Sequence, residues 1–190
     1  IRCCYRLLVF QLAFSADGTR FLAQNKASLE IWDVRARQRV QSLPIGKTKL
    51  LAAAFSRNGD FIAIADEDSI SVWRMGNSAA TPVATIDDAN PATSVAIAPT
   101  GEVVVAGSSD GTMSIWDLQA PKDHPLLRQR SHQNRISSLA FTPDGQFLAS
   151  GSWDNSVKLW SVVTEKEQRT LSELRTLNGA PALLTWRGEQ

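Results

Sequence analysis

Four apolar stretches of similar composition punctuate the chain, and each is bounded by turn residues. They are rich in valine, isoleucine, leucine, phenylalanine and alanine, and they begin at Phe21, Phe61, Val103 and Phe147. Polar alternation is missing from them, which is typical of strands buried on both faces. No stretch of the chain has the period of a helix. The pattern therefore predicts an all-β protein in which these four strands lie inside the core.

These strands belong to a tandem repeat of about 42 residues. Two series of side chains recur with this period, and the two series keep the same offset from one unit to the next. The apolar anchors Phe14, Phe55, Ile97 and Phe141 are 41, 42 and 44 residues apart, and Trp32, Trp73, Trp116 and Trp160 are 41, 43 and 44 residues apart. A turn pair follows each apolar anchor at Asp17-Gly18, Asn58-Gly59, Thr100-Gly101 and Asp144-Gly145. Such pairs supply the positive φ that a tight hairpin needs.

Each unit contains two further predicted strands. The third strand of each unit alternates more than the second and should have a wetter side; the four read "SLEIWDV", "SISVWRM", "TMSIWDL" and "SVKLWSV". The fourth strands are expected near residues 38–43, 80–86, 124–130 and 167–171. Four strands in every unit favour one antiparallel four-stranded sheet per repeat and disfavour a helical solenoid.

The residues at these positions resemble the WD-repeat family of β-propellers. The Trp-Asp dipeptide is intact at Trp32-Asp33 and Trp116-Asp117, and the resemblance covers residues 5 to about 171. In the fourth unit, the positions of the family's structural hydrogen-bonded tetrad hold His132, Ser150, Asp154 and Trp160. The resemblance implies propeller blades of four antiparallel strands.

The first three units depart from the tetrad pattern. The histidine position falls near Tyr5, Gly46 and Asp88, and the serine position falls near Gln24, Ile64 and Ala106. Asp110 keeps the turn carboxylate, with Glu67 or Asp66 as a stand-in in the second unit. We expect these blades to depend on apolar packing against their neighbours.

The repeat divides the chain into approximate blades. We expect them at 5–46, 47–88, 89–131 and 132–174, with 175–190 as the start of a further blade or a tail. Propellers have 4 to 8 blades, so four units are the fewest expected to close a ring. Residues 178–190 resemble the start of another unit, with Trp186 lying 45 residues after Phe141, so we expect a partial ring. Missing segments of a longer propeller or another chain would then complete it, and a closed four-blade ring is the alternative.

Composition excludes several classes of function. Lys and Arg number 20 against 19 Asp and Glu, so no overall field attracts nucleic acid. Apolar stretches are far shorter than the roughly 20 residues of a membrane-spanning helix. The vicinal pair Cys3 and Cys4 is unsuited to a disulfide framework, which favours a reducing compartment, with the cytoplasm as the default location. Two histidines and this cysteine pair lack metal-ligand spacing, so we assign no metal and no cofactor.

Three apparent catalytic patterns have structural explanations. The sequence "GSSDG" at 107–111 matches a nucleophile turn, but a strand rather than a helix is expected to follow it. The "GKT" at 46–48 lacks the glycine that a phosphate-binding loop needs. His132, Asp154 and Ser150 are better explained as a buried brace than as a catalytic triad. We therefore expect a non-enzyme.

The resemblance also indicates where partners would dock. Trp153 is off the repeat's period, directly before Asp154, and the family's docking face would include it together with Gln133 and Arg135. The matching positions in other units are Ser109, Lys47 and Lys49, and these lysines favour an acidic ligand. Tryptophan and arginine on one rim are typical of an interface hot spot. Alternatively, Trp153 lies against a neighbouring loop and Arg135 is merely solvated.

Two functions remain open from the sequence. The first is a non-catalytic scaffold that binds partner proteins or peptides on the propeller face. The second is a sensor or targeting module within a larger polypeptide whose activity, enzymatic or not, is encoded elsewhere. A hydrolase with this fold is a remote third, since no carboxylate cluster is evident for a central channel.

Overall fold

The computed structural model describes residues 12–15, 17–24, 28–44, 49–76, 80–87, 90–120, 125–165 and 168–178. Within these ranges the chain forms sixteen strands and no helix. The strands make four antiparallel sheets of four strands each. None of the described segments is a helix that is long and apolar enough to cross a bilayer. The all-β fold with one four-stranded sheet per repeat is confirmed.

Within every sheet the strands follow chain order, so each sheet is a meander. The first contains β1 (Leu12–Phe14), β2 (Arg20–Gln24), β3 (Ser28–Asp33) and β4 (Gln38–Pro44). The second contains β5 (Ala52–Phe55), β6 (Phe61–Ala65), β7 (Ser69–Met75) and β8 (Ala80–Asp87). The third contains β9 (Ala92–Ile97), β10 (Val103–Ser108), β11 (Thr112–Asp117) and β12 (Leu127–Arg130). The fourth contains β13 (Ile136–Phe141), β14 (Phe147–Ser152), β15 (Ser156–Glu165) and β16 (Gln168–Asn178).

The predicted hairpin glycines adopt positive φ. Their φ angles are +67° at Gly18, +74° at Gly59, +75° at Gly101 and +74° at Gly145. In three of these hairpins, a hydroxyl group two residues before the Asp or Asn donates a 2.6 Å hydrogen bond to its side chain; the donors are Ser15, Ser56 and Thr142. These turns join the first two strands of each sheet and fix their register.

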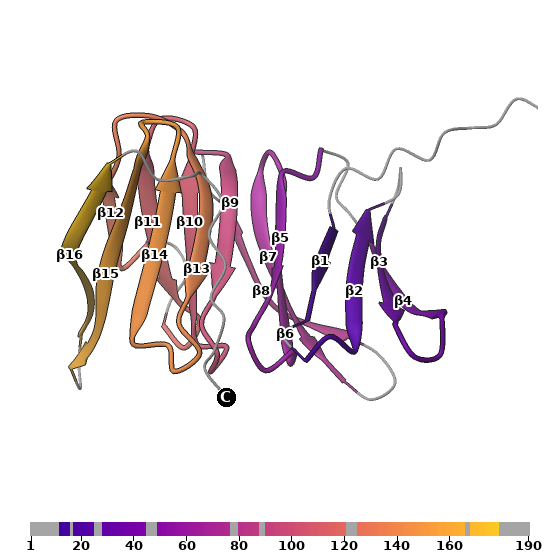
Figure 1. Ribbon diagram of the computed structural model, residues 1–190. Helices are drawn as coiled ribbons and strands as arrows, with labels where there is room; N and C mark the ends of the chain where they lie inside the picture. The colour runs from indigo at the N-terminus through magenta and orange to yellow at the C-terminus, as the bar shows by residue number, and fades with distance from the viewer. Residues whose placement is uncertain are drawn as a thin grey trace, which may run out of the picture.

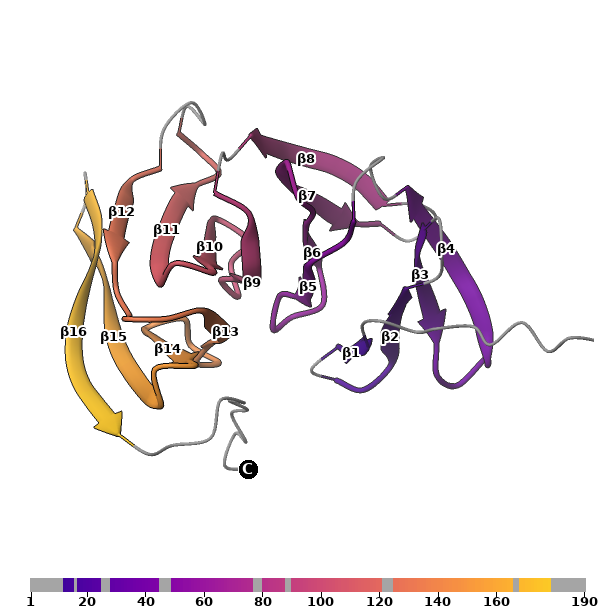
Figure 2. The same ribbon diagram turned by 90° about the horizontal axis from the view of Figure 1, so that it is seen from above.

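The four sheets follow an arc around a common centre (Figure 1, Figure 2). The first strand of each sheet, β1, β5, β9 or β13, lies nearest the centre, and the fourth lies at the outside (Figure 2). The arc does not close on itself, with the first and fourth sheets at its two ends. The predicted partial ring of propeller blades is thus confirmed.

Apolar clusters join consecutive sheets, and the repeat's tryptophans lie within them. In each of three interfaces, one sheet presents its tryptophan face to the preceding sheet: Trp73 packs against a cluster that contains Leu22, Trp116 lies with Ala63 and Val72, and Trp160 lies with Val105 and Met113. Trp116 and Trp160 are 2% and 3% exposed. Packing of this kind, rather than contacts within one blade, supplies the buried apolar surface.

Burial differs from the predicted pattern at two strands. In β6, β10 and β14 nearly every residue is buried, as predicted, but in β2 only Leu22 is fully buried. The prediction for β2 was wrong because no other described sheet covers the second face of the first sheet. The strand β11 is also more buried than predicted, with all residues from Met113 to Trp116 buried. The strands β3 and β7 alternate as predicted.

Candidate functional site

The fourth sheet holds a chain of polar side chains directly beneath its loops. His132 lies in the β12–β13 loop, Ser150 on β14, Asp154 in the β14–β15 turn and Trp160 on β15. The His132 Nε2 atom is 2.7 Å from the Ser150 Oγ atom, and Nδ1 is 3.0 Å from the Asp154 Oδ2 atom. The Trp160 Nε1–H donates to the Ser150 Oγ atom at 2.9 Å. The structure thus brings the four predicted tetrad residues together.

The donor and acceptor roles along this chain are consistent with one neutral histidine tautomer. The indole N–H of Trp160 can only donate, so the Ser150 oxygen accepts it and the hydroxyl proton points to His132 Nε2. The Nδ1–H of His132 then donates to the Asp154 carboxylate. Each polar group has a partner, which is the condition for burying such a network without an energetic penalty.

Asp154 receives more hydrogen bonds than the tetrad alone supplies. Burial acts to raise its pKa, but hydrogen bonds from the Ser156 hydroxyl, the Gln133 backbone N–H and His132 outweigh that effect and hold the pKa well below its usual range. The Ser156 hydroxyl lies 2.6 Å from the Asp154 Oδ1 atom and 3.1 Å from His132 Nδ1. The carboxylate is therefore ionised at neutral pH and anchors both loops.

The serine and the histidine of the tetrad are both buried. Ser150 is 0% exposed and His132 is 2% exposed. The Ser150 oxygen already accepts a hydrogen bond from the Trp160 N–H. The hydrogen bonds of these side chains thus hold the β12–β13 loop against the β14–β15 turn.

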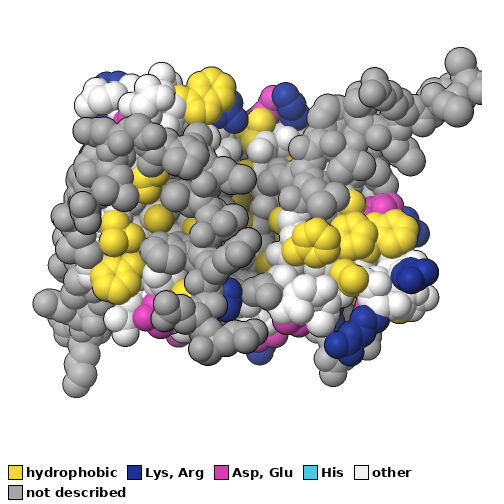
Figure 3. All heavy atoms as spheres, viewed as in Figure 1, with side chains coloured by type: hydrophobic (Ala, Val, Ile, Leu, Met, Phe, Trp, Pro, Cys, Tyr) yellow, Lys and Arg dark blue, Asp and Glu magenta, His cyan; other side chains and the backbone are white. Residues whose placement is uncertain are grey.

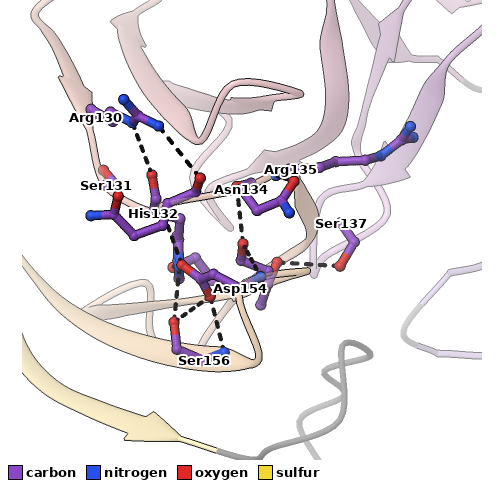
Figure 4. Close-up of polar contacts among 12 residues, drawn as sticks. Arg130, Ser131, His132, Asn134, Arg135, Ser137, Asp154 and Ser156 are labelled. Carbon is purple, nitrogen blue, oxygen red and sulfur yellow. Dashed lines mark hydrogen bonds and ion pairs between the residues drawn. The ribbon is translucent and has the colours of Figure 1, made fainter.

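Further hydrogen bonds hold the backbone of these two loops. Arg130 donates to the carbonyl oxygens of His132 and Gln133 at 3.4 Å each. The Ser152 hydroxyl donates to the Asn134 carbonyl at 3.0 Å, and the Trp153 N–H donates to the Arg135 carbonyl at 3.0 Å. Figure 4 shows this network and the Arg135 side chain extending away from it. We call the residues 131–135 and 153–155, together with 109–111 of the third sheet and 66–68 of the second, the loop face.

Trp153 and Arg135 are in direct contact on the loop face. The Arg135 guanidinium carbon is 5.2 Å from the centroid of the Trp153 ring, which is within the range of a cation–π interaction. Trp153 is 59% exposed, the largest exposed fraction among the large hydrophobic side chains of the described residues. Arg135 is half-buried, and in the described structure it has no ion-pair partner.

Of the other predicted partner-binding residues, Gln133 and Ser109 belong to the loop face. Gln133 is exposed beside the brace, and Ser109 is exposed in the β10–β11 turn. Lys49 is exposed before β5, and Lys47 lies outside the described residues. Among the described members of this set, the structure shows a contact between Arg135 and Trp153.

The first three sheets replace the tetrad with other contacts. Tyr5, Gly46 and Asp88 lie outside the described residues, while Ile64 and Ala106 are buried apolar residues. Asp110 accepts hydrogen bonds from the Thr112 N–H and the Asn90 amide, which outweigh the effect of burial and lower its pKa. Asp66, rather than Glu67, accepts from the Ser69 N–H and hydroxyl. No group of three or more histidine, cysteine or acidic side chains suited to a metal ion occurs among the described residues.

Two members of the brace were missed by sequence reasoning. Ser156 bridges His132 and Asp154, and Arg130 fixes the loop backbone. A signal for Ser156 was available, because a serine or threonine precedes the tryptophan by four residues in every unit: Ser28, Ser69, Thr112 and Ser156. Arg130 has no such signal, since its role depends on loop geometry.

Comparison with known proteins identifies the repeat and the fold. A family model described as "WD domain, G-beta repeat" matches residues 80–117 and 124–161. Each matched segment runs from the outermost strand of one sheet through the first three strands of the next, so every repeat is shared between two blades. The β-propeller domain of Cps50 (Swd1) from Myceliophteria thermophila superposes with a TM-score of 0.73 at 15% identity, over 90% of this chain and 59% of that one.

Curated relatives share the sequence over a shorter span. Cilia- and flagella-associated protein 52 is 29% identical over 131 residues in Sus scrofa and in Mus musculus, and 28% identical over 131 residues in Homo sapiens. Each match covers 65% of this chain and 21% of the relative. The chain thus spans about a fifth of the length of these relatives.

Proposed function

We propose that this chain, which belongs to the WD-repeat β-propeller family, is a non-catalytic scaffold that binds other proteins or peptides on its loop face. The observation that carries the proposal is the exposed Trp153 ring in cation–π contact with the Arg135 guanidinium, on loops braced by a buried network. Tryptophan and arginine are enriched at binding hot spots. Rigid support reduces the ordering cost of binding.

The charge around Trp153 favours an acidic segment of the partner. The Arg135 Nε atom is buried and lacks an acceptor within the described structure, and leaving such a donor unpaired costs about 1–3 kcal/mol. The nearest carboxylate of the same loops, Asp154, is already bound by His132, Ser156 and Gln133. A carboxylate of the partner would pair with the solvent-facing side of the Arg135 guanidinium, while an apolar part of the partner covers the indole.

The test begins with proteins captured by the wild-type chain from ciliated cells, because the relatives are named for cilia and flagella. The affinity of each captured protein is then measured by calorimetry for the wild type, Trp153→Ala, Arg135→Ala and Arg135→Lys. Loss of a hot-spot residue should weaken binding by about 30-fold or more. Arg135→Lys keeps the charge but loses the planar guanidinium, so it should weaken binding less than Arg135→Ala.

The matched control is Leu126→Ala. Leu126 is also an exposed hydrophobic residue, but it precedes β12 at the opposite end of the third sheet from the loop face. The proposal requires every partner that depends on Trp153 to bind Leu126→Ala with wild-type affinity. Partners that bind all of these variants equally would place the binding surface elsewhere.

A second candidate is a targeting module within a larger protein, favoured by the 21% of the relatives' length that the chain matches. In that case the isolated chain binds nothing by itself, and binding appears only when flanking segments are present. For the location, we propose the cytoplasm, as expected from the sequence. Imaging of a tagged copy in ciliated cells tests the location and separates cytoplasm from cilium.

A further inference from the structure

The β5–β6 hairpin contains an asparagine followed by a glycine, Asn58 and Gly59. It lies at the end of the second sheet opposite the loop face (Figure 1), and charged side chains reach the surface along this end of the molecule (Figure 3). The Asn58 side chain is exposed to solvent, and Gly59 has no side chain to shield its backbone nitrogen. Asparagine is one of the thermolabile residue types. An Asn-Gly step in this setting is open to attack of the glycine nitrogen on the side-chain amide.

The reaction consumes only water and releases ammonia. A base from the solvent removes the Gly59 N–H proton, and the nitrogen attacks the Asn58 Cγ atom. The bond between Cγ and Nδ2 breaks, and ammonia leaves with a proton, so that the two residues share a cyclic imide. Water then adds to one of the two imide carbonyls. Addition at Cγ gives aspartate, and addition at the backbone carbonyl gives isoaspartate, so both products carry a new carboxylate and no oxidant or reductant is required.

The closed hairpin holds both reacting groups. The Gly59 N–H donates to the Ser56 carbonyl oxygen at 2.9 Å. The Asn58 Oδ1 atom accepts hydrogen bonds from the Ser56 hydroxyl at 2.6 Å and from the Asp60 N–H at 3.2 Å. Because the glycine nitrogen must leave its acceptor before it can attack, the reaction proceeds when the turn opens. Surface turns open at a low free-energy cost compared with core strands.

The polar pair in this hairpin is the reverse of the pair in the first hairpin. There, the Thr19 hydroxyl donates to the Asp17 carboxylate at 2.8 Å. Hydrogen bonds from Ser15 and Thr19 lower the pKa of Asp17 to about 2. In the β5–β6 hairpin, the Asn58 amide instead donates to the Asp60 carboxylate at 2.8 Å. The first hairpin therefore stabilises a carboxylate at this position of the turn, whereas the second stabilises an amide.

We infer that Asn58 is a site of spontaneous deamidation and that its product weakens the second sheet. The reaction removes the donor to Asp60 and brings two carboxylates together where an amide and a carboxylate were paired. Like charges at this separation repel one another. The isoaspartate product also lengthens the hairpin backbone by a methylene group. The β5–β6 hairpin should therefore close less readily after the reaction than before it.

Peptide mapping by mass spectrometry tests the site. The folded chain is incubated at neutral pH beside a sample in concentrated urea, in which Asn178 and Gly179, the chain's other Asn-Gly step, report the rate without a hairpin. In the folded chain, Asn58 should gain the mass difference between –NH2 and –OH about 10- to 100-fold more slowly than in urea. If no product formed at Asn58 in the folded chain by the time the reaction in urea was complete, the inference would be overturned.

The variant Ser56→Ala tests whether the reaction follows opening of the hairpin. It removes the hydroxyl that donates to Asn58 and accepts the Phe61 N–H at 2.9 Å. The folded variant should deamidate about three- to tenfold faster than the wild type, with an unchanged rate in urea. Ser15→Ala is the matched control, because it removes the equivalent hydroxyl from the first hairpin. Equal rates at Asn58 in the two variants would contradict the role of the hairpin.

The variant Asn58→Asp supplies one product in pure form. It should lower the urea midpoint and raise the unfolding equilibrium constant about threefold or more. When combined with Asp60→Thr, which copies the pair of Asp17 and Thr19, the same change should leave the midpoint unaltered. Equal losses in both backgrounds would contradict repulsion between the two carboxylates. None of these outcomes bears on the loop-face scaffold, which is tested separately.

Discussion

Gly101, in the β9–β10 hairpin of the third sheet, lies against the ring of Phe61 on the second sheet. A Cβ atom at Gly101 would overlap that ring, and the glycine also has a φ of +75°. The hairpin glycine therefore has two functions, which are to make the turn and to let the neighbouring blade approach.

Replacement of Gly101 by alanine should destabilise the protein more than the same change at Gly18. Gly18 has a φ of +67° but nothing within 4 Å of an added Cβ atom, so Gly18→Ala measures backbone strain alone. That strain costs about 1–2 kcal/mol. Overpacking against Phe61 should add about 1–3 kcal/mol in Gly101→Ala. Urea unfolding of the two variants measures the difference, and equal losses would show that the blades do not meet at this point.

Removal of the His132 side chain should weaken the fourth sheet without affecting the other interfaces. His132→Ala leaves Ser150, Asp154 and Ser156 with fewer partners in a buried site, at a cost of about 1–3 kcal/mol. Gln133→Ala is the control, because its exposed side chain lies outside the brace. Chemical denaturation compares them. If His132→Ala were as stable as Gln133→Ala, the hydrogen bonds of the tetrad would not contribute to the stability of the fold.

Acid should reduce the contribution of Asp154 to stability. Its pKa is lowered on folding, so its contribution is complete above the unfolded value of about 3.9 and is lost as the pH falls towards the folded value. The difference in unfolding free energy between the wild type and Asp154→Asn should be constant from pH 5 to 7 and about 1 kcal/mol smaller at pH 3. Urea titrations at these pH values measure it. A difference that is unchanged or larger at pH 3 would mean that the carboxylate is not stabilised by its hydrogen bonds.

The hydroxyl of Thr93 should stabilise the contact between the third and fourth sheets. It lies 2.6 Å from the Ile136 carbonyl oxygen on the fourth sheet and 3.0 Å from the Gly107 carbonyl on its own sheet. Thr93→Val should cost about 0.5–1.5 kcal/mol, while Thr93→Ser keeps the hydroxyl and should cost less. Native-state hydrogen exchange reports whether β13 loses protection in Thr93→Val. If β13 exchanged its amide hydrogens at the same rate in Thr93→Val and Thr93→Ser, the Thr93 hydrogen bond would not contribute to joining the blades.

The fold could be predicted because the sequence repeats. Four copies of one strand pattern expose the period even where the tetrad residues are missing, and the hairpin glycines mark each turn by a backbone requirement that few other residues meet. The burial of β2 was predicted wrongly for a related reason. The apolar composition of β2 is that of a strand buried on both faces. Its actual exposure depends on whether a neighbouring sheet covers the second face, and none of the described sheets does.

The candidate site was predictable in its members but not in its contacts. His132, Ser150, Asp154 and Trp160 occupy repeat positions, and the register of β14 and β15 brings Ser150 and Trp160 to the same side of the sheet. The cation–π contact of Arg135 with Trp153 depends on rotamers of two loop side chains, which no periodic pattern encodes. Their role in binding partners stays a prediction.

The labelling rates of individual tryptophans in the 190-residue chain test the blade architecture most directly. Hydroxyl-radical footprinting with mass spectrometry should find Trp116 and Trp160 protected, because each is packed against a preceding sheet, and Trp153 and Trp32 oxidised rapidly. Trp73 should fall between these groups. If Trp116 and Trp160 were oxidised as fast as Trp153, the stacking of blades through their tryptophan faces would be contradicted.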